Sequence, residues 1–148
     1  MQFPGGKAVI HIRTASPEDF SVLQKIYASC IGCAHWLPEE ARGAPVLAEV
    51  SMNETISVAV NDASQILGFI SVQPDDPFVH HLYISSDAQG NGVGAMLLKS
   101  LDAWLPKPWR LKCVRKNDRA LKFYACNGWV EVDSGESKHG AYALLSFG

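Results

Sequence analysis

The sequence has little excess of charge of either sign. Its 13 Lys and Arg residues are nearly balanced by 15 Asp and Glu residues, which leaves a formal net charge of -2. Binding to nucleic acid or to an anionic membrane would therefore need a local basic patch, because the chain as a whole does not attract polyanions. We expect neither nucleic acid nor membrane among its partners.

Long apolar runs are also absent. No stretch approaches the roughly 20 apolar residues that a membrane-spanning helix needs. The segment Met1–Lys7 lacks the continuous apolar core of a secretory signal. These absences predict a cytoplasmic protein.

Cysteine is scarce, with four residues in 148. That is too few for a disulfide scaffold of this size, so we expect the reduced thiols that are usual in the cytoplasm. Cys30 and Cys33 form one CxxC pair with His35 close by. A structural zinc site needs a second such pair, whereas Cys113 and Cys126 are isolated. The prediction is that the protein binds no metal.

The chain does contain enough apolar residues for one hydrophobic core. They make up 47% of the sequence, and a chain of this length buries roughly two-thirds of its surface on folding. There is no internal repeat, no low-complexity stretch and no linker longer than a loop. We therefore predict a single domain over residues 1–148.

The segment Ser16–Asp19 predicts the start of a helix, because it has an N-cap hydroxyl, a first-turn proline and an acid at the third helical position. Apolar side chains then recur at three- and four-residue spacing, which predicts one apolar helix face. Those residues are Phe20, Leu23, Ile26, Tyr27 and Cys30. The stretch 34–45 is typical of a loop or a short second helix.

Strand and helix patterns alternate along the rest of the chain. Runs of β-branched and aromatic residues predict strands, and amphipathic segments that end at Pro or Gly predict helices. The expected strands are 9–13, 56–60, 66–72, 78–84, 109–114, 129–132 and 142–147, and the further helices are 93–105 and 117–127. This order predicts an α/β (α+β) fold, with helices on the faces of a mixed sheet.

A glycine-rich turn, Ser85–Gly94, joins the strand 78–84 to the next helix. Glycines at alternate positions leave backbone N–H groups unshielded at the positive end of that helix, where a pyrophosphate can bind. No Gly-Lys-Ser/Thr follows, and no βαβ unit surrounds the turn, so neither a Walker loop nor a dinucleotide site is indicated. A purely structural strand-to-helix turn is the alternative.

Two segments together resemble the GNAT superfamily of N-acetyltransferases. They are Leu82-x-Ile84 followed by Gln89-x-x-Gly92-x-Gly94, and Asn117-x-x-Ala120-x-x-Phe123-Tyr124-x-x-x-Gly128-Trp129. The resemblance implies a mostly antiparallel sheet of about six or seven strands, flanked by helices, whose fourth and fifth strands splay apart. It also implies transfer of an acetyl group from acetyl coenzyme A to the amine of a small molecule or peptide.

The resemblance assigns the cofactor to the space between the two splayed strands. Backbone groups of Leu82, Tyr83 and Ile84 would pair with the pantetheine arm, and one N–H would polarise the thioester carbonyl. The turn would wrap the pyrophosphate with Gln89, Gly90, Asn91, Gly92, Val93 and Gly94. Asn117 would act both as a helix N-cap and as a cofactor contact.

Tyr124 matches the general acid of the family, whose hydroxyl protonates the departing coenzyme A thiolate. A phenol suits that role because it stays protonated at neutral pH. The alternative is a core aromatic on an amphipathic helix. Basic residues near the start of this helix could attract the 3′-phosphate, or form a solvated face: Lys112, Arg115, Lys116, Arg119 and Lys122.

The general base is expected at His80, where many relatives carry a Glu or His. A protonated amine cannot attack a thioester, so a group near neutral pKa, or a water chain, must take its proton. Strand alternation places His80 on the face of Leu82 and Ile84, with His81 on the opposite face. A rim or interior histidine without a catalytic role is the alternative.

Acceptor specificity in this fold tends to come from the loop after the first helix and from the loop between the last two strands. Here these hold Trp36, Glu39, Glu40 and residues 133–140, which would suit a cationic amine with an apolar body. A non-catalytic acyl-CoA sensor or interaction domain is the alternative function. The exposed C-terminal strand could support a homodimer.

Overall fold

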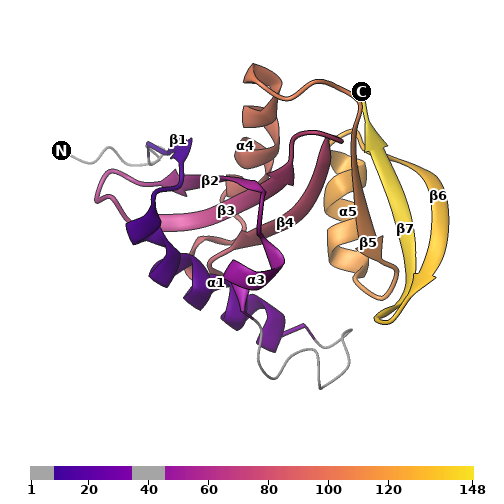
Figure 1. Cartoon of the computed structure of the whole chain (residues 1–148), viewed down its shortest axis with the longest axis horizontal. Coiled ribbons are helices and arrows are strands. Elements are labelled where there is room, and N and C mark those ends of the chain that lie inside the picture. The colour runs from indigo at the N-terminus through magenta and orange to yellow at the C-terminus, as the bar shows by residue number, and fades with distance from the viewer. Residues whose placement is uncertain (1–8, 35–45) are drawn as a thin grey trace.

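A computed structural model describes residues 9–34 and 46–148 (Figure 1). The strands are β1 (His11–Thr14), β2 (Thr55–Val60), β3 (Ile66–Gln73), β4 (Phe78–Ile84), β5 (Trp109–Val114), β6 (Val130–Ser137) and β7 (Gly140–Phe147). The α-helices are α1 (Phe20–Gly32), α3 (Leu47–Val50), α4 (Val93–Ser100) and α5 (Asp118–Cys126). Single 3₁₀ turns are η1 (Pro17–Asp19), η2 (Ser86–Ala88) and η3 (Leu101–Ala103).

The seven strands form one sheet in the order β1-β2-β3-β4-β5-β7-β6. Every neighbouring pair is antiparallel except β4 and β5, which run parallel. The predicted mixed, mostly antiparallel sheet with flanking helices is therefore confirmed.

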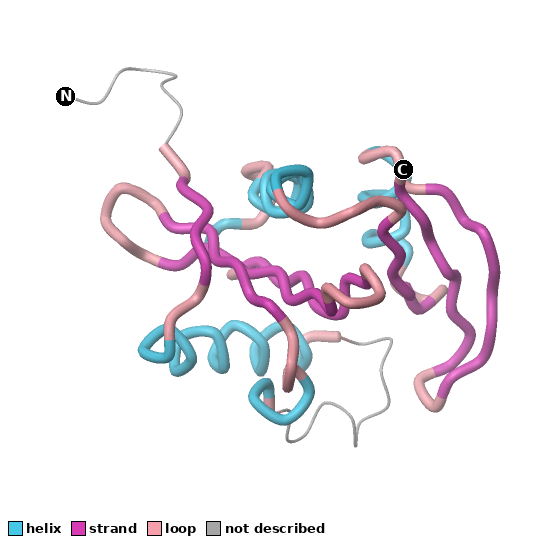
Figure 2. The backbone as a smooth tube through the Cα atoms, turned by 45° about the horizontal axis from the view of Figure 1, so that its top comes forward, coloured by secondary structure: helices cyan, strands magenta, loops and turns pink. Residues whose placement is uncertain are grey.

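Helices cover both faces of the sheet, as Figure 2 shows. On one face, α1 and α3 pack Leu23 and Leu47 against Phe69 of β3, and all three side chains are fully buried. On the other face, Leu97 of α4 lies in a second core that includes Trp109 of β5. The sheet is thus buried on both sides at its centre, which accounts for the nearly continuous apolar runs of β2 and β3.

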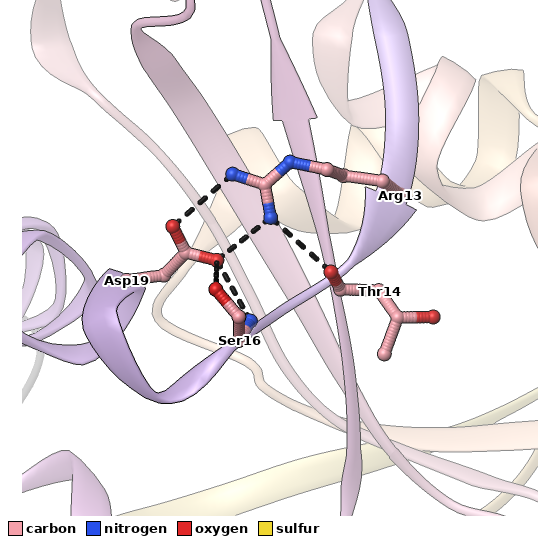
Figure 3. Close-up of polar contacts among 4 residues, drawn as sticks. All are labelled: Arg13, Thr14, Ser16 and Asp19. Carbon is pink, nitrogen blue, oxygen red and sulfur yellow. Dashed lines mark hydrogen bonds and ion pairs between the residues drawn. The ribbon is translucent and has the colours of Figure 1, made fainter.

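The start of α1 is organised by the carboxylate of Asp19 (Figure 3). It accepts two hydrogen bonds from the Arg13 guanidinium, at 2.7 and 3.1 Å, and one from the backbone N–H of Ser16 at 2.8 Å. The Ser16 hydroxyl donates to the same carboxylate at 3.1 Å. The Arg13 hydrogen bond, followed by those from Ser16, lowers the pKa of the buried Asp19 carboxyl far below its usual range. The predicted helix start is confirmed, with one 3₁₀ turn leading into α1.

Two element boundaries differ from the sequence prediction. The helix expected to run to residue 105 ends as an α-helix at Ser100 and continues as η3. Residues 133–140, expected as a loop, mostly belong to β6, which extends to Ser137. Polar and glycine residues make that segment a poor strand former by itself, but pairing along the whole of β7 holds it extended.

No helix within residues 9–34 and 46–148 is both long enough and apolar enough to cross a membrane.

Candidate active site

The strands β4 and β5 pair only at their beginning. Phe78 lies opposite Arg110, whose N–H donates to the carbonyl of Pro77 at 3.2 Å, and no other residue pair joins these two strands. Beyond that point the strands diverge, so the predicted splay is confirmed (Figure 1). A cleft of about 350 Å³ lies beside this divergence, lined by His80 from β4 and Lys112 from β5. Over most of its length, β4 therefore pairs with a strand on one side only, the side of β3.

The glycine-rich turn has the left-handed backbone that its glycines predict. Gly90 and Gly92 have φ of +84° and +78°, and Gly92 is the N-cap of α4. A Cβ added to either glycine would meet no protein atom within 4 Å. The space beside the turn is open, and the first N–H groups of α4 have no partner of their own within the helix. This geometry fits a diphosphate.

Side chains of the turn brace it from within. Gln89 donates to the carbonyl of Ile84 at 3.2 Å, and Asn91 donates to the carbonyl of Ala88 at 3.2 Å. The Ile84 carbonyl also accepts from the thiol of Cys30 at 3.5 Å. Ile84 is one of the three β4 residues expected to pair with a pantetheine arm, but its carbonyl already accepts these two hydrogen bonds.

Gly94 serves the packing of two helices. A Cβ at this position would lie 3.0 Å from the ring of Phe123 on α5. The absence of a side chain lets α5 approach the first turn of α4. Because α5 also carries Tyr124, this contact sets the distance between the glycine-rich turn and the phenol.

Tyr124 is partly buried on the same side of the sheet as α4. Its ring makes edge contacts with Phe123 and Trp129, at centroid distances of 5.2 and 5.8 Å. Burial raises the pKa of the Tyr124 phenol well above its ordinary value, with a smaller effect from Cys113. The phenol therefore stays protonated throughout the range in which an acyl transfer would run.

The start of α5 shows which predicted polar residues are already engaged. Asn117 accepts from the N–H of Ala120 at 3.2 Å, as an N-cap does. Arg115 forms a two-pronged ion pair with Glu131, at 3.0 and 2.6 Å. The ammonium of Lys112 lies 4.9 Å from the ring centre of Tyr142.

A β-bulge in β4 corrects the expected orientation of His80. Ser71 of β3 pairs with His81, and the next residue, Val72, pairs with Val79. His80 is therefore an extra residue in β4, and the bulge breaks the alternation of side chains. His80 does not share the face of Leu82 as predicted: it lies beside His81, with its ring centre 6.3 Å away.

Both histidines face a carboxylate that sequence reasoning missed. Glu54, immediately before β2, has Oε2 3.8 Å from Nδ1 of His80 and Oε1 3.9 Å from Nε2 of His81. Its side chain is only 8% exposed, and it accepts a short hydrogen bond from the hydroxyl of buried Ser71. No local pattern marks Glu54, because its partners belong to β3 and β4.

His81 packs into an aromatic cluster on the α1 side of the sheet. Its ring stacks on Tyr83 with centroids 6.0 Å apart and makes an edge contact with Tyr27 at 5.7 Å. Burial lowers the pKa of His81 below its ordinary value, although nearby Glu54 opposes that shift. Burial likewise raises the pKa of the Tyr83 phenol. The side chain of Tyr83 thus belongs to the core, whatever its backbone binds.

The cysteines do not form a nucleophilic or metal site in the described part of the chain. Burial raises the pKa of the Cys113 thiol to about 11, so it remains protonated. Burial also raises the pKa of the Cys30 thiol. Among residues 9–34 and 46–148, no group of three or more His, Cys, Asp or Glu side chains is arranged to hold a metal ion. The predicted acceptor residues Trp36, Glu39 and Glu40 lie outside the described residues.

Comparison with known proteins identifies this arrangement. Residues 52–131, more than half of the chain, match the Acetyltransferase (GNAT) domain family. That segment contains the splayed β4, the glycine-rich turn, Tyr124 and Glu54. No curated protein sequence matches the chain.

Solved structures share the whole fold at low sequence identity. The apo form of YjaB from Escherichia coli is 22% identical, with a TM-score of 0.75 over 94% of this chain and 97% of that one. The yncA protein of Salmonella typhimurium, a putative acetyltransferase solved with acetyl-CoA, is 14% identical, with a TM-score of 0.72 over 94% and 93%. A spermidine N-acetyltransferase SpeG chimera from Vibrio cholerae and hSSAT is 13% identical, with a TM-score of 0.70 over 93% and 94%. Together with the family match, the splayed sheet and its glycine-rich turn show that this chain belongs to the GNAT acetyltransferase family.

Proposed function

We propose that this protein transfers an acetyl group from acetyl coenzyme A to an amine by direct attack within a ternary complex. The observation that carries this proposal is the splay: β4 leaves β5 after a single residue pair, and the open glycine-rich turn lies at the far end of β4. When bound, acetyl coenzyme A supplies the activated thioester. The residues of this chain bind the cofactor and supply the acid and the base.

Backbone groups would make most of the contacts that bind acetyl coenzyme A. The space beside Gly90 and Gly92 is open, and backbone N–H groups of Gln89–Gly94 at the start of α4 would bind the diphosphate there. The free edge of β4 at Leu82 would pair with the amide-containing arm and direct its N–H at the thioester carbonyl, whereas the backbone of Tyr83 faces Phe69 of β3. Asn117, already an N-cap, would lie beside this arm at the start of α5.

Acid and base act on the two ends of the reaction. The imidazole of His80 takes a proton from the acceptor ammonium, and the free amine nitrogen then bonds to the acetyl carbon. As the carbon–sulfur bond breaks, the hydroxyl of Tyr124 protonates the sulfur, and the phenolate that remains takes the second proton from the nitrogen as it becomes an amide. The one net proton of the reaction leaves through His80 to solvent. The raised pKa of Tyr124 keeps the phenol protonated before the carbon–sulfur bond breaks. The same shift makes the phenol a weaker acid, so proton transfer has to follow the build-up of negative charge on the sulfur.

The acceptor is proposed to be a cationic amine. A second cavity, which shares Gln73 with the lining of the first, is also lined by Glu54 and Asp75. Asp76 lines the first cavity near His80. These carboxylates would attract an ammonium group to the open side of the splay.

An acceptor screen tests the proposal. Consumption of acetyl coenzyme A would be measured with polyamines, amino acids, arylalkylamines, aminoglycosides and lysine-containing peptides, and calorimetry would measure binding of the cofactor alone. We expect binding without acceptor and turnover with at least one cationic class. Binding with no turnover on any acceptor would favour an acyl-CoA sensor, and no binding would reject the proposal.

A further inference from the structure

Glu54 is a buried carboxylate that the fold does not require. A charged group that is 8% exposed costs stability unless it is paired. Here it receives one hydrogen bond from the Ser71 hydroxyl and faces the imidazoles of His80 and His81. The packing of β4 does not require His80, because His80 occupies a bulge and its side chain is 37% exposed.

The negative charge of the Glu54 carboxylate favours a proton on the nitrogen of His80 that faces it. Nδ1 of His80 faces Oε2 of Glu54 at 3.8 Å, and a carboxylate can only accept. Nε2 faces Oε1 of the Gln73 side-chain amide at 3.3 Å. That amide can present either its oxygen or its NH₂ group, so it adapts to the tautomer and does not set it. The favoured form has its proton on Nδ1 and a lone pair on Nε2.

The same reasoning separates His81 from His80. Nε2 of His81 faces two acceptors, the Val50 carbonyl at 3.4 Å and Oε1 of Glu54 at 3.9 Å, so it must carry a proton. Its other nitrogen, Nδ1, is buried and has no hydrogen-bond partner in the described chain. The lone pair of His81 is therefore sealed from any acceptor, whereas His80 lines the cleft beside the splay.

The 3.8 Å separation between Glu54 and His80 is longer than a hydrogen bond. Such contacts in empty sites commonly tighten when substrate binds, and one water molecule can also bridge them. Ser71 and the start of β2 hold the carboxylate in place, so the imidazole is the part that would move.

We propose that Glu54 is a positioning residue that holds the proton on Nδ1 of His80, so that Nε2 serves as the base that accepts the proton of the substrate ammonium. The inference rests on the proposed function, and extends it to a residue that lies immediately before β2. The other charged or titratable groups around His80 are His81 on β4, Lys112 on β5 and Asp76 in the cleft wall.

The first test reads the tautomer directly and needs no activity. Nitrogen-15 NMR of histidine-labelled full-length protein would be recorded above the titration range of His80. We expect the Nε2 resonance of His80 at the position of an unprotonated ring nitrogen, and that of His81 at the position of a protonated one. A protonated Nε2 on His80 would overturn the proposal, whether or not the protein transfers acetyl groups.

The second test replaces the carboxylate. In Glu54→Gln we expect a mixture of His80 tautomers and a kcat about 100-fold lower, with binding of acetyl coenzyme A unchanged. Glu54→Asp should restore part of kcat, and Glu49→Gln, the same change at an exposed site on α3, should match the wild type.

The outcomes separate the two proposals. If acetyl coenzyme A binds and is turned over but Glu54→Gln keeps the wild-type kcat and the wild-type His80 tautomer, the role of Glu54 is rejected while the proposed function stands. If no acceptor is acetylated at all, the proposed function fails, and the NMR tautomer alone then decides whether Glu54 orients His80. Should Glu54→Gln fail to fold, the wild-type NMR measurement still decides.

Discussion

At the scale of single residues, the phenol of Tyr124 has properties that suit its proposed role as an acid. Its ring is held by Phe123 and Trp129, and burial raises its pKa. The protonated form is therefore retained at pH values where an ordinary tyrosine, with a pKa of about 10, begins to ionise. A catalytic acid at this position would lose activity only in strongly alkaline solution.

Replacing Tyr124 by Phe removes the proton donor and keeps the ring. We expect kcat to fall by about 100-fold, with the dissociation constant of acetyl coenzyme A nearly unchanged. Steady-state kinetics and calorimetry measure the two quantities. Tyr142→Phe, the same change on β7, serves as the control and should leave kcat intact. Wild-type turnover in Tyr124→Phe would show that the thiolate takes its proton elsewhere.

Asp19 is a second residue whose environment makes a measurable prediction. Its carboxylate accepts from Arg13 and Ser16, so Asp19→Asn should lower the free energy of unfolding by about 1–2 kcal/mol at neutral pH. Because the pKa of Asp19 is lowered on folding, the stabilisation is complete above the unfolded pKa and fades as pH falls through the folded one.

Urea unfolding across pH tests the role of Asp19. The difference between wild type and Asp19→Asn should be constant above about pH 5 and should shrink below about pH 4, near the carboxyl pKa of an unfolded chain. Glu18→Gln, at the neighbouring exposed position, should have little effect at any pH. A difference that persists unchanged in acid would mean that the charge of Asp19 is not what stabilises α1.

At the scale of elements, the glycine-rich turn separates two uses of glycine. Gly92 adopts a left-handed backbone beside open space, whereas Gly94 makes room for Phe123. The first is a requirement of backbone conformation and of ligand approach. The second is a requirement of packing between α4 and α5.

Gly92→Ala should weaken binding of acetyl coenzyme A by at least about tenfold while lowering stability by about 1 kcal/mol, the usual penalty of a left-handed alanine. Gly140→Ala is the matched control. It also has a positive φ and open space where a Cβ would be, but it is the first residue of β7, at the β6–β7 hairpin. It should show a similar stability loss and no change in binding. Equal binding by both variants would remove the turn from the cofactor site.

Gly94→Ala should behave in the opposite way. Its Cβ would lie 3.0 Å from the Phe123 ring, and overpacking of this kind costs about 1–3 kcal/mol. Thermal unfolding would measure the loss. The double variant Gly94→Ala with Phe123→Leu should recover part of it, because the smaller side chain makes room. Without any recovery, the contact between α4 and α5 would not be the cause.

At the scale of the whole molecule, cofactor binding should stabilise the sheet as a unit. The splay divides the sheet into β1–β4 on one side and β5, β7 and β6 on the other, and one residue pair of β4 and β5 joins these halves. A ligand that pairs with β4 and contacts α4 would hold the halves together. At a concentration 100 times its dissociation constant, a ligand adds about 2.7 kcal/mol to stability. For a chain of this size, that is a rise in Tm of about 5–10 °C.

Measuring the rise in Tm with dephospho-coenzyme A tests whether the basic residues near α5 bind the 3′-phosphate. If free basic groups near α5 bind the 3′-phosphate, this analogue should give a smaller rise in Tm than coenzyme A at equal concentration. Arg115 is already paired with Glu131, so Arg115→Gln should not account for the difference. Equal shifts from both compounds would show that the 3′-phosphate stays in solvent.

Much of the fold and site follows from local patterns in the chain. The helix start at Ser16–Asp19, the left-handed glycines of the turn and the N-cap at Asn117 each depend on residues a few positions apart. Such interactions act within one turn or one strand, so a single sequence displays them. The apolar runs of β2 and β3 likewise reveal their burial.

Tertiary structure decided what depends on partners far along the chain. The bulge at His80 exists only in the register of β4 against β3, and it turns the imidazole towards Glu54, which no motif links to it. The length of β6 depends on its pairing with β7, against the preference of its own polar residues. Register and strand pairing are set by the packing of the whole sheet, because local propensity is too weak to determine them.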